Sequence, residues 1–438
     1  MQVKVIKFGG SSLADAEQFK KVADIIHEDP ARRYVVPSAP GKRFKEDTKV
    51  TDMLYACFEK AMNNENFDED FAKIIDRYEA IISGLGLTLD MTKEYERIKS
   101  AFMHRPGRDY AASRGEYLNG IILANYLGFD FIDAASVIFF QDNGSYDSEH
   151  TNVMLSSILR NHKQAVIPGF YGSMPNGTIK TFSRGGSDIT GSIVARAVNA
   201  DIYENWTDVS GFLMADPRIV DNPKPIETIT YRELRELSYM GATVLHEDAI
   251  FPVRFAGIPI NIKNTNIPTD PGTMIVSTTS DYSSDDVITG VAGKKGLSVI
   301  NIEKDMMNAE IGFGRKVLSV LEDGGVPFEH LPSGIDTMSV VVNTACIDKN
   351  RDKIVREICL KTTPDSVSIE DGLALIAIVG RGMIRSKGTA ARVFNALTSA
   401  NINVRIVDQG SSELNIIIGV DERDYENALK AIYNEFVK

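Results

Sequence analysis

The stretch Lys4-Val-Ile-Lys-Phe-Gly-Gly-Ser-Ser-Leu13 predicts a strand that breaks into a glycine turn, and a helical pattern follows over residues 14–26. This succession aims backbone N–H groups and a helix N-terminus at an anion. Gly9 and Gly10 allow the backbone to approach a phosphate closely, and Lys7 can place positive charge where phosphoryl charge develops. On this stretch alone, a phosphate site and an ordinary βα turn with a surface lysine are equally open.

The composition is that of a globular protein with more than one domain. The chain has 438 residues, of which 43% are hydrophobic and 25% are charged, so we expect two or three domains. Its net charge of −12 disfavours broad attraction to nucleic acid or to an anionic membrane. No apolar run approaches the roughly 18 residues of a membrane span, and no signal-peptide pattern opens the sequence. We expect a cytoplasmic protein.

The three cysteines are too few and too scattered for a disulfide framework or a zinc site. They are Cys57, Cys346 and Cys359. We interpret them as reduced thiols, buried as small apolar residues.

Short apolar strands alternate with helical stretches from residue 1 to about 275. Examples are residues 33–36, 165–168, 200–203 and 258–262. Such alternation predicts an α/β domain on a mainly parallel sheet, with functional loops at the carboxyl ends of the strands. The polar run over residues 277–286 is typical of a linker.

An internal repeat follows this linker. Residues 296–302 (GLSVINI) align with residues 372–378 (GLALIAI), and the same ungapped offset of 76 residues matches apolar positions further along both copies. The pattern predicts two βαββαβ units, at residues 287–365 and 366–438, with exchange of strands between them left open. Because edge strands need partners, we expect pairing between the copies or between chains.

A second glycine pair precedes a predicted helix within Thr181-Phe-Ser-Arg-Gly-Gly-Ser-Asp-Ile-Thr-Gly191. Arg184 can bind a carboxylate through two parallel hydrogen bonds. Asp188 can accept hydrogen bonds from Lys7 or help to hold a metal ion. The alternative is that Asp188 only caps the helix.

Three further segments carry polar residues beside predicted strands or helices. Residues 205–218 end a strand at Thr207-Asp208 and then turn twice, which on its own is more typical of a structural loop than of one that holds a nucleotide. Residues 113–118 predict a helix start, so Glu116 is either a partner of the helix dipole or a pocket residue. Residues 35–41 end a strand in small residues, and a charged excursion, Lys42–Lys49, follows as either a flexible lid or a solvated loop.

The familiar nucleotide motifs are absent. The sequence has neither a Walker A motif nor a dinucleotide fingerprint after a strand, and it lacks the protein-kinase glycine loop and H-R-D set. Any nucleotide chemistry therefore needs a different phosphate cradle.

Taken together, the motifs Lys7-Phe-Gly-Gly-Ser-Ser12, Arg184-Gly-Gly-Ser-Asp188, Thr207-Asp-Val-Ser-Gly211 and Asp216-Pro-Arg218 resemble those of the aspartate kinases in the amino-acid kinase family. The tail Gln409–Ile416 is similar to their second ACT domain. The resemblance covers the whole chain in order. It implies a three-layer α/β amino-acid kinase domain at residues 1–280, with a mainly parallel sheet, and two ferredoxin-like ACT units.

The resemblance also implies an activity and a set of site residues. The activity is transfer of the ATP γ-phosphoryl group to the β-carboxylate of L-aspartate, giving 4-phospho-L-aspartate with Mg²⁺ as cofactor, the first step towards lysine, threonine and methionine. No metal ligand is assigned to a side chain. The implied residues are Lys7 and Asp188 for catalysis; Lys7, Phe8, Gly9, Gly10, Thr207, Asp208, Leu213, Arg218, Thr243 and Val244 for ATP; and Ser38, Thr51, Glu116, Arg184 and Ser187 for aspartate.

Tandem ACT units further imply feedback regulation and assembly. The candidate effector site includes Met307, Glu329 and Asp336, with lysine as the first expected effector and threonine as the second. Pairing of ACT units implies a homodimer or a dimer of dimers. The alternatives are another amino-acid kinase, or an inactive amino-acid sensor that retains its ACT half. Many aspartate kinases have a tyrosine where Leu213 stands and a lysine where Thr243 stands.

Overall fold

The computed structural model describes residues 2–183, 185–242, 250–277 and 286–437, and the chain divides into two compact units. Unit 1 comprises residues 1–212, 226–231 and 244–282, and unit 2 comprises residues 213–225, 232–243 and 283–438. The predicted boundary near residue 280 therefore differs from the division by contacts. Two earlier segments, 213–225 and 232–243, belong with the C-terminal unit.

Unit 1 is built on an eight-stranded sheet that has helices on both faces. Its elements are β1 (Lys4–Phe8), η1 (Gly10–Leu13), α1 (Ala16–Glu28), β2 (Arg32–Pro37), α2 (Val50–Met62), α3 (Asp68–Gly84), α4 (Thr92–Met103), α5 (Arg108–Leu127), β3 (Asp130–Phe131), η2 (Ala134–Ser136), α6 (Ser148–Leu159), β4 (Ala165–Val166), β5 (Tyr171–Ser173), β6 (Ile179–Thr181), α7 (Gly186–Ala197), β7 (Ile202–Thr207), β8 (Thr228–Thr230), α9 (Phe251–Ala256), β9 (Ile260–Asn264) and β10 (Thr273–Val276).

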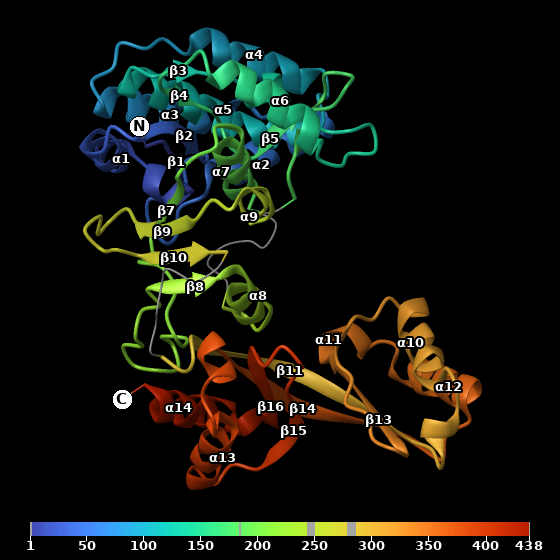
Figure 1. Cartoon of the computed structure of the whole chain (residues 1–438). Coiled ribbons are helices and arrows are strands. Elements are labelled where there is room, and N and C mark those ends of the chain that lie inside the picture. The colour runs from blue at the N-terminus through green and yellow to red at the C-terminus, as the bar shows by residue number, and fades with distance from the viewer. Residues whose placement is uncertain (1, 184, 243–249, 278–285, 438) are drawn as a thin grey trace. The chain divides into compact units, whose positions relative to one another are not determined.

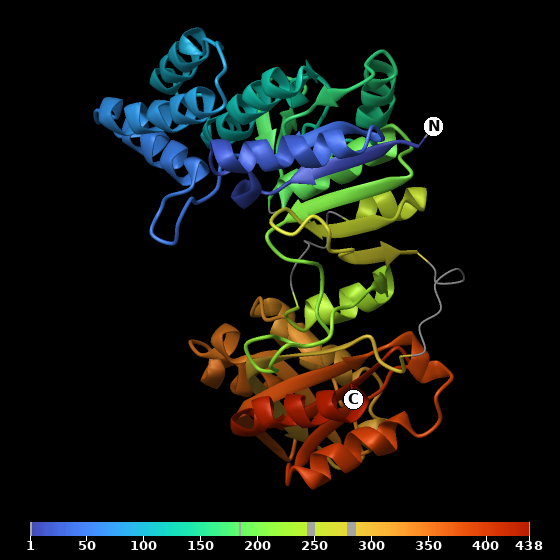
Figure 2. The same ribbon diagram turned by 90° about the vertical axis from the view of Figure 1, so that its left-hand side faces the viewer.

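The strand order of this sheet is β3-β4-β2-β1-β7-β9-β10-β8, and of its neighbouring pairs only β9 with β10 is antiparallel. Figures 1 and 2 show α1 on one face and α5 and α7 on the other. The predicted three-layer domain with a mainly parallel sheet is confirmed. Because β1, β2 and β7 are parallel neighbours, the loops that follow them meet at one edge of the sheet.

Unit 2 is built on a six-stranded antiparallel sheet of order β12-β13-β11-β14-β16-β15. Its elements are α8 (Tyr231–Tyr239, whose first residue belongs to unit 1), β11 (Gly290–Glu303), η4 (Met307–Ala309), α10 (Phe313–Asp323), β12 (Phe328–His330), β13 (Thr337–Asn343), α11 (Thr344–Ile347), α12 (Arg351–Thr362), β14 (Ser366–Val379), η5 (Arg381–Ile384), α13 (Thr389–Ser399), β15 (Val404–Asp408), β16 (Asn415–Asp421), η6 (Glu422–Asp424) and α14 (Tyr425–Phe436).

The two copies of the repeat share their longest strands. β11 and β14 begin 76 residues apart, at 290 and 366, and they pair along their whole lengths. The C-terminal part of β11 pairs with β13, whereas its N-terminal part completes the sheet of the second copy beside β14 and β16. A boundary between residues 365 and 366 therefore separates strands that both copies use. The register shifts beside Gly296 and Gly372, which both have a φ of +77°, a backbone conformation that glycine adopts without strain.

Several local expectations need correction. Helix α5 begins at Arg108 rather than near Ser113, and α7 begins at Gly186 rather than Ser192, because helix starts leave only a weak trace in sequence. All three cysteines are free, as expected, but only Cys57 is buried; Cys346 and Cys359 are exposed, since they lie on the outer sides of their helices. Among the described residues, none of the helices has the length and apolar character that a membrane crossing requires.

Candidate active site

Lys7 lies at the centre of a buried polar cluster on the sheet of unit 1. Its Nζ atom is 2.6 Å from Oδ1 of Asp188 and 3.4 Å from Oδ1 of Asn205. The Asn205 amide also donates to Asp188 Oδ1 over 2.9 Å. Lys7 and Asn205 are register partners on β1 and β7, and α7 brings Asp188 to them. The predicted contact between Lys7 and Asp188 is therefore present, and Lys7 is only 7% exposed.

Asp188 stands in the first turn of α7, and Gly185 occupies the N-cap position without a side-chain cap. The alternative that Asp188 serves only as a helix cap is therefore wrong. Gly185 has a φ of +60°, which favours glycine at this sharp entry into the helix. The turn delivers both Ser187 and Asp188 to the sheet edge.

The glycine turn after β1 is closely packed against the loop after β2. A Cβ atom on Gly10 would lie 2.8 Å from the Ala39 carbonyl oxygen, and one on Gly41 would lie 2.6 Å from the Gly10 carbonyl carbon. The Gly41 amide donates to the Gly10 carbonyl over 2.8 Å. Side chains at either glycine would separate the two loops. Phe8 can offer only its backbone to a ligand at this turn, because its ring is buried and stacked on Trp206.

Glu116 is the least satisfied acid of the site. It lies in the middle of α5, so the interpretation as a helix-dipole partner is wrong. Its side chain is 6% exposed, and its Oε2 atom has no hydrogen-bond partner. Burial raises its pKa to about 8, although hydrogen bonds from the backbone amides of Ala39 and Glu116 itself oppose the shift. The carboxyl group faces the loop after β2.

The other candidate aspartate residues surround the same loop. The Ser38 amide donates to the Phe8 carbonyl over 3.1 Å. A Cβ atom on Gly115 would lie 3.8 Å from the Thr51 hydroxyl, which places Thr51 beside the helical turn of Glu116. Ser187 packs against Gly169, whose amide donates to the last residue of β2. The fold thus brings Ser38, Thr51 and Glu116 together and holds Ser187 at the end of β2.

The candidate nucleotide residues are divided between the two units and the residues that the structure does not describe. Thr207 ends β7, and its hydroxyl donates to the exposed Asp208 carboxylate over 3.1 Å. Leu213 and Arg218 belong to unit 2, where Arg218 is bound to Asp216 over 2.6 Å. Arg184, Thr243 and Val244 lie outside the described residues. Their assignments, like those of Leu213 and Arg218, stay predictions.

The candidate effector residues have different surroundings within unit 2. Met307 is buried in the apolar core of the first repeat copy. Asp336 is exposed and accepts a hydrogen bond from the Met306 amide over 2.9 Å. Glu329 contacts Lys294 and accepts a hydrogen bond from Tyr239. Burial opposes ionisation of Glu329, but these two hydrogen bonds prevail and hold its pKa below the ordinary value. Their effector roles are untested.

Sequence reasoning missed Asn205 and Asn119. Asn205 is 4% exposed, and Asn119 is fully buried and donates to the Ser38 carbonyl over 2.7 Å. The signal was present in Ile202-Tyr-Glu-Asn-Trp-Thr207, where two polar residues interrupt a strand whose centre is buried. A buried polar side chain requires a partner, so such residues in a strand indicate either a structural network or a site.

No cluster of three or more carboxylate, imidazole or thiol side chains suited to a metal ion occurs within the described ranges. A magnesium ion commonly needs only one or two carboxylates when substrate phosphates and water supply its other ligands. Lys7 and Asn205 both contact the Asp188 carboxylate through its Oδ1 atom. The donor set therefore fits an ion that enters with a nucleotide, and does not fit a cage made by protein alone.

Comparison with known proteins identifies the family. Residues 2–264 match the amino acid kinase family model, and residues 376–436 match an ACT domain model. Aspartokinase 3 of Bacillus subtilis is 38% identical over 449 aligned residues, which cover 99% of this chain and 98% of that protein.

Solved structures agree with this result. The crystal structure of Clostridium acetobutylicum aspartate kinase superimposes with a TM-score of 0.95 at 56% identity, covering 99% of this chain and 100% of that one. Escherichia coli aspartokinase III, solved with aspartate and ADP, shares the fold with a TM-score of 0.76 at 24% identity, over the full length of both chains. The chain therefore belongs to the aspartokinases of the amino acid kinase family.

Proposed function

We propose that this aspartokinase transfers the γ-phosphoryl group of ATP to the β-carboxylate of L-aspartate. The bond between the γ-phosphorus and the oxygen that bridges it to the β-phosphorus breaks, and a bond from the γ-phosphorus to a carboxylate oxygen forms. The products are ADP and 4-phospho-L-aspartate. No proton has to be removed from the acceptor, since a carboxylate with an ordinary pKa near ~4 is ionised at neutral pH. Catalysis is then mainly positioning and electrostatic stabilisation.

The buried cluster around Lys7 is the observation that carries this proposal. The Lys7 ammonium is held by Asp188 over 2.6 Å and lies beside the glycine turn, where a Cβ atom on Gly9 would be 3.6 Å from it. A fixed positive charge in a site with little solvent stabilises the charge that develops on the transferring phosphoryl group without reorganising during the reaction. Asn205 and Asp188 keep the ammonium in place.

We assign Ser38, Thr51 and Glu116 to binding of the acceptor. The unpaired Oε2 atom of Glu116 is a suitable acceptor for the α-ammonium group of aspartate. A guanidinium group binds a carboxylate in two-pronged fashion, so we assign the α-carboxylate to Arg184. Ser187 remains assigned to the same substrate.

For ATP, we assign the backbone of residues 8–10 to binding of the phosphates. We assign Thr207 and Asp208 to binding of the rest of the nucleotide. We also propose Mg²⁺ as the cofactor, with Asp188 as the nearest candidate ligand. When bound, the ion would neutralise part of the charge on the nucleotide phosphates.

The test is an assay coupled to ADP release, with L-aspartate, glutamate, acetylglutamate and UMP offered separately. We expect turnover with aspartate alone. Hydroxylamine added to the reaction should trap an acyl phosphate as a hydroxamate, which identifies a carboxylate as the acceptor. Turnover with another acceptor and none with aspartate would exclude the proposed substrate. Absence of turnover with all four would instead favour an inactive sensor.

We further propose that the protein is cytoplasmic, that the ACT units bind an amino-acid effector, and that they pair two chains into a homodimer or a dimer of dimers. Lysine is the first candidate effector and threonine the second. Calorimetric titration with each amino acid, separately and together, distinguishes them, and light scattering in the same buffers gives the oligomer size. A chain that binds neither amino acid and stays monomeric would refute this part of the proposal.

A further inference from the structure

A buried arginine outside the assigned site connects both of its main loops. Arg77 lies on α3 and is 5% exposed. Its Nη2 atom donates to the Gly41 carbonyl over 2.6 Å and to the Ala14 carbonyl over 3.1 Å, and its Nε atom donates to the Ala14 carbonyl over 3.3 Å. Its Nη1 atom contacts the Asp47 carboxylate at 2.8 Å. One guanidinium group thus holds two carbonyls and one acid.

These two carbonyls belong to the loops that carry the candidate site. Ala14 is the C-cap residue of the short helix η1, which starts at Gly10 in the phosphate turn. Gly41 lies in the loop after β2, which also contains Ser38 and Ala39 and faces Glu116. Because the guanidinium fork is planar and rigid, it fixes the separation of the two carbonyls more narrowly than a flexible ammonium could.

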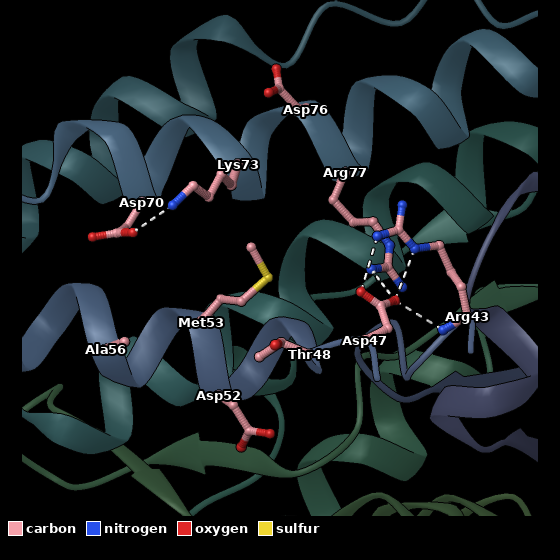
Figure 3. A pocket seen from close by; sticks show the side chains of 10 residues that line it. All are labelled: Arg43, Asp47, Thr48, Asp52, Met53, Ala56, Asp70, Lys73, Asp76 and Arg77. Atoms are coloured by element: carbon pink, nitrogen blue, oxygen red, sulfur yellow. Dashed lines mark hydrogen bonds and ion pairs between the residues drawn. The ribbon is translucent and has the colours of Figure 1, made fainter. Parts of the chain in front are cut away.

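Asp47 explains the charged excursion Lys42–Lys49. Its side chain is 9% exposed, and it accepts hydrogen bonds from Arg43 as well as Arg77. The hydrogen bonds from Arg43, helped by the charge of Arg77, outweigh burial and hold the pKa of the Asp47 carboxyl well below its usual range. Figure 3 shows both arginines converging on this carboxylate. The part of the excursion around Asp47 is therefore pinned, although Phe44 remains 58% exposed.

We propose that Arg77 is a positioning residue of the kinase reaction, which sets the phosphate loop after β1 against the acceptor loop after β2. Asp47 holds the guanidinium group in place, and delivering this acid is the role of the Lys42–Lys49 excursion. Arg77 acts through the two loops and touches neither substrate. The inference rests on the proposed assignment of those loops to ATP and aspartate.

The test uses Arg77→Ala in the full chain. A displacement of about 1 Å between reacting groups costs on the order of a hundredfold in rate, so we expect kcat/KM for both ATP and aspartate to fall roughly 10- to 100-fold. A pocket of about 520 Å³ is lined by Arg77, Asp47 and Lys73, so in the variant it leads to the space that the Arg77 side chain occupied. Added guanidinium ion should therefore enter and restore several-fold activity in the variant, and should not activate the wild-type enzyme.

Asp47→Asn provides an independent test of the proposal, and Lys73→Gln provides the matched control. Asp47→Asn should lower the same parameters by a smaller factor, and its effect should not add to that of Arg77→Ala. Lys73 lines the same pocket one turn away on α3 but its side chain is 63% exposed and pairs with Asp70, so its variant should keep wild-type kinetics. Should Arg77→Ala fail to fold, Asp47→Asn and Arg77→Lys still test the proposal.

Two results would overturn the positioning role. The first is a folded Arg77→Ala enzyme with unchanged kcat/KM for both substrates. The second is an Asp47→Asn enzyme with wild-type kinetics. Failure of the proposed function is recognised separately, because it would appear as absence of aspartate turnover in the wild-type enzyme itself.

Discussion

Lys7 and Glu116, two buried ionisable side chains of the candidate site, are satisfied in opposite ways. Lys7 is engaged by Asp188 and Asn205, so its ammonium is held before any ligand arrives. Glu116 is equally buried, yet one of its carboxyl oxygens has no partner and its pKa is raised to about 8. The contrast indicates that the phosphate side is arranged in advance, whereas a bound ammonium group completes the acceptor side. Substitutions at these two residues and at their neighbours test whether the contrast holds.

The largest effect is expected from Lys7→Met. Loss of a fixed charge beside a developing negative charge costs on the order of 10²–10³ in kcat, and here it also leaves Asp188 without its cation. Steady-state ADP release measures kcat. Lys4→Met is the matched control, because Lys4 lies on the same strand but pairs with Asp29 and Glu204. Equal activity of the Lys7 variant and the wild-type enzyme would exclude the assigned role.

Glu116→Gln should act on aspartate rather than on ATP. The neutral amide cannot form an ion pair with an ammonium group, a loss of about 2–3 kcal/mol that corresponds to roughly a hundredfold rise in KM for aspartate. The KM for ATP should stay within about twofold of the wild-type value, because Glu116 is assigned no contact with ATP. Glu79→Gln, at an exposed acid that accepts from Tyr95, is the control. An unchanged KM for aspartate would move the ammonium site elsewhere.

Asn205→Leu should produce an intermediate loss. The variant removes the 2.9 Å hydrogen bond to Asp188 and one of the two polar contacts of Lys7, so we expect kcat to fall roughly tenfold with both KM values nearly constant. Tyr203→Phe is a useful contrast, because the Tyr203 hydroxyl donates to the backbone carbonyl of Asp188 rather than to its carboxylate. A larger loss in Tyr203→Phe than in Asn205→Leu would show that the carboxylate contact is not the one that matters.

The last prediction concerns stability rather than activity, and its effect has the opposite direction. Between the ordinary pKa of 4.5 and the folded value of about 8, Glu116 keeps a proton that the unfolded chain loses, so ionisation of the unfolded chain opposes folding increasingly as pH rises. Glu116→Gln should therefore be more stable than wild type by roughly 3–4 kcal/mol at pH 8, and by less than about 1 kcal/mol at pH 5. Trp206, the single tryptophan of the chain, is fully buried in unit 1 and reports its denaturation by fluorescence. A gain independent of pH would contradict the raised pKa.

The arrangement of the candidate phosphate residues could be predicted from the sequence better than that of the candidate acceptor residues, and the reason is physical. Gly9, Gly10 and Lys7 are neighbours in the chain, and a strand–turn–helix unit fixes their geometry locally. Glu116 depends on where α5 begins and on how Gly115 packs against Ala39, which are tertiary properties. The contact between Arg77 and Asp47 joins residues of two separate elements and leaves no local signature.

The internal repeat is the second part of the fold that could be predicted from the sequence, although the pairing of its strands could not. Its period gave the helices α10 and α13 in matching positions, at residues 313–323 and 389–399. The sharing of β11 and β14 between the copies could not be derived from the period, because it depends on which edges pair in space.

Proton release on aspartate binding tests the central claim most directly. Calorimetric titration of aspartate into the enzyme at pH 7, in buffers of different ionisation enthalpy, gives the number of protons exchanged. If Glu116 is protonated in the free enzyme and ionised beside the bound ammonium group, close to one proton should be released by the wild type and none by Glu116→Gln. Tight binding to the wild type without proton release would contradict the account.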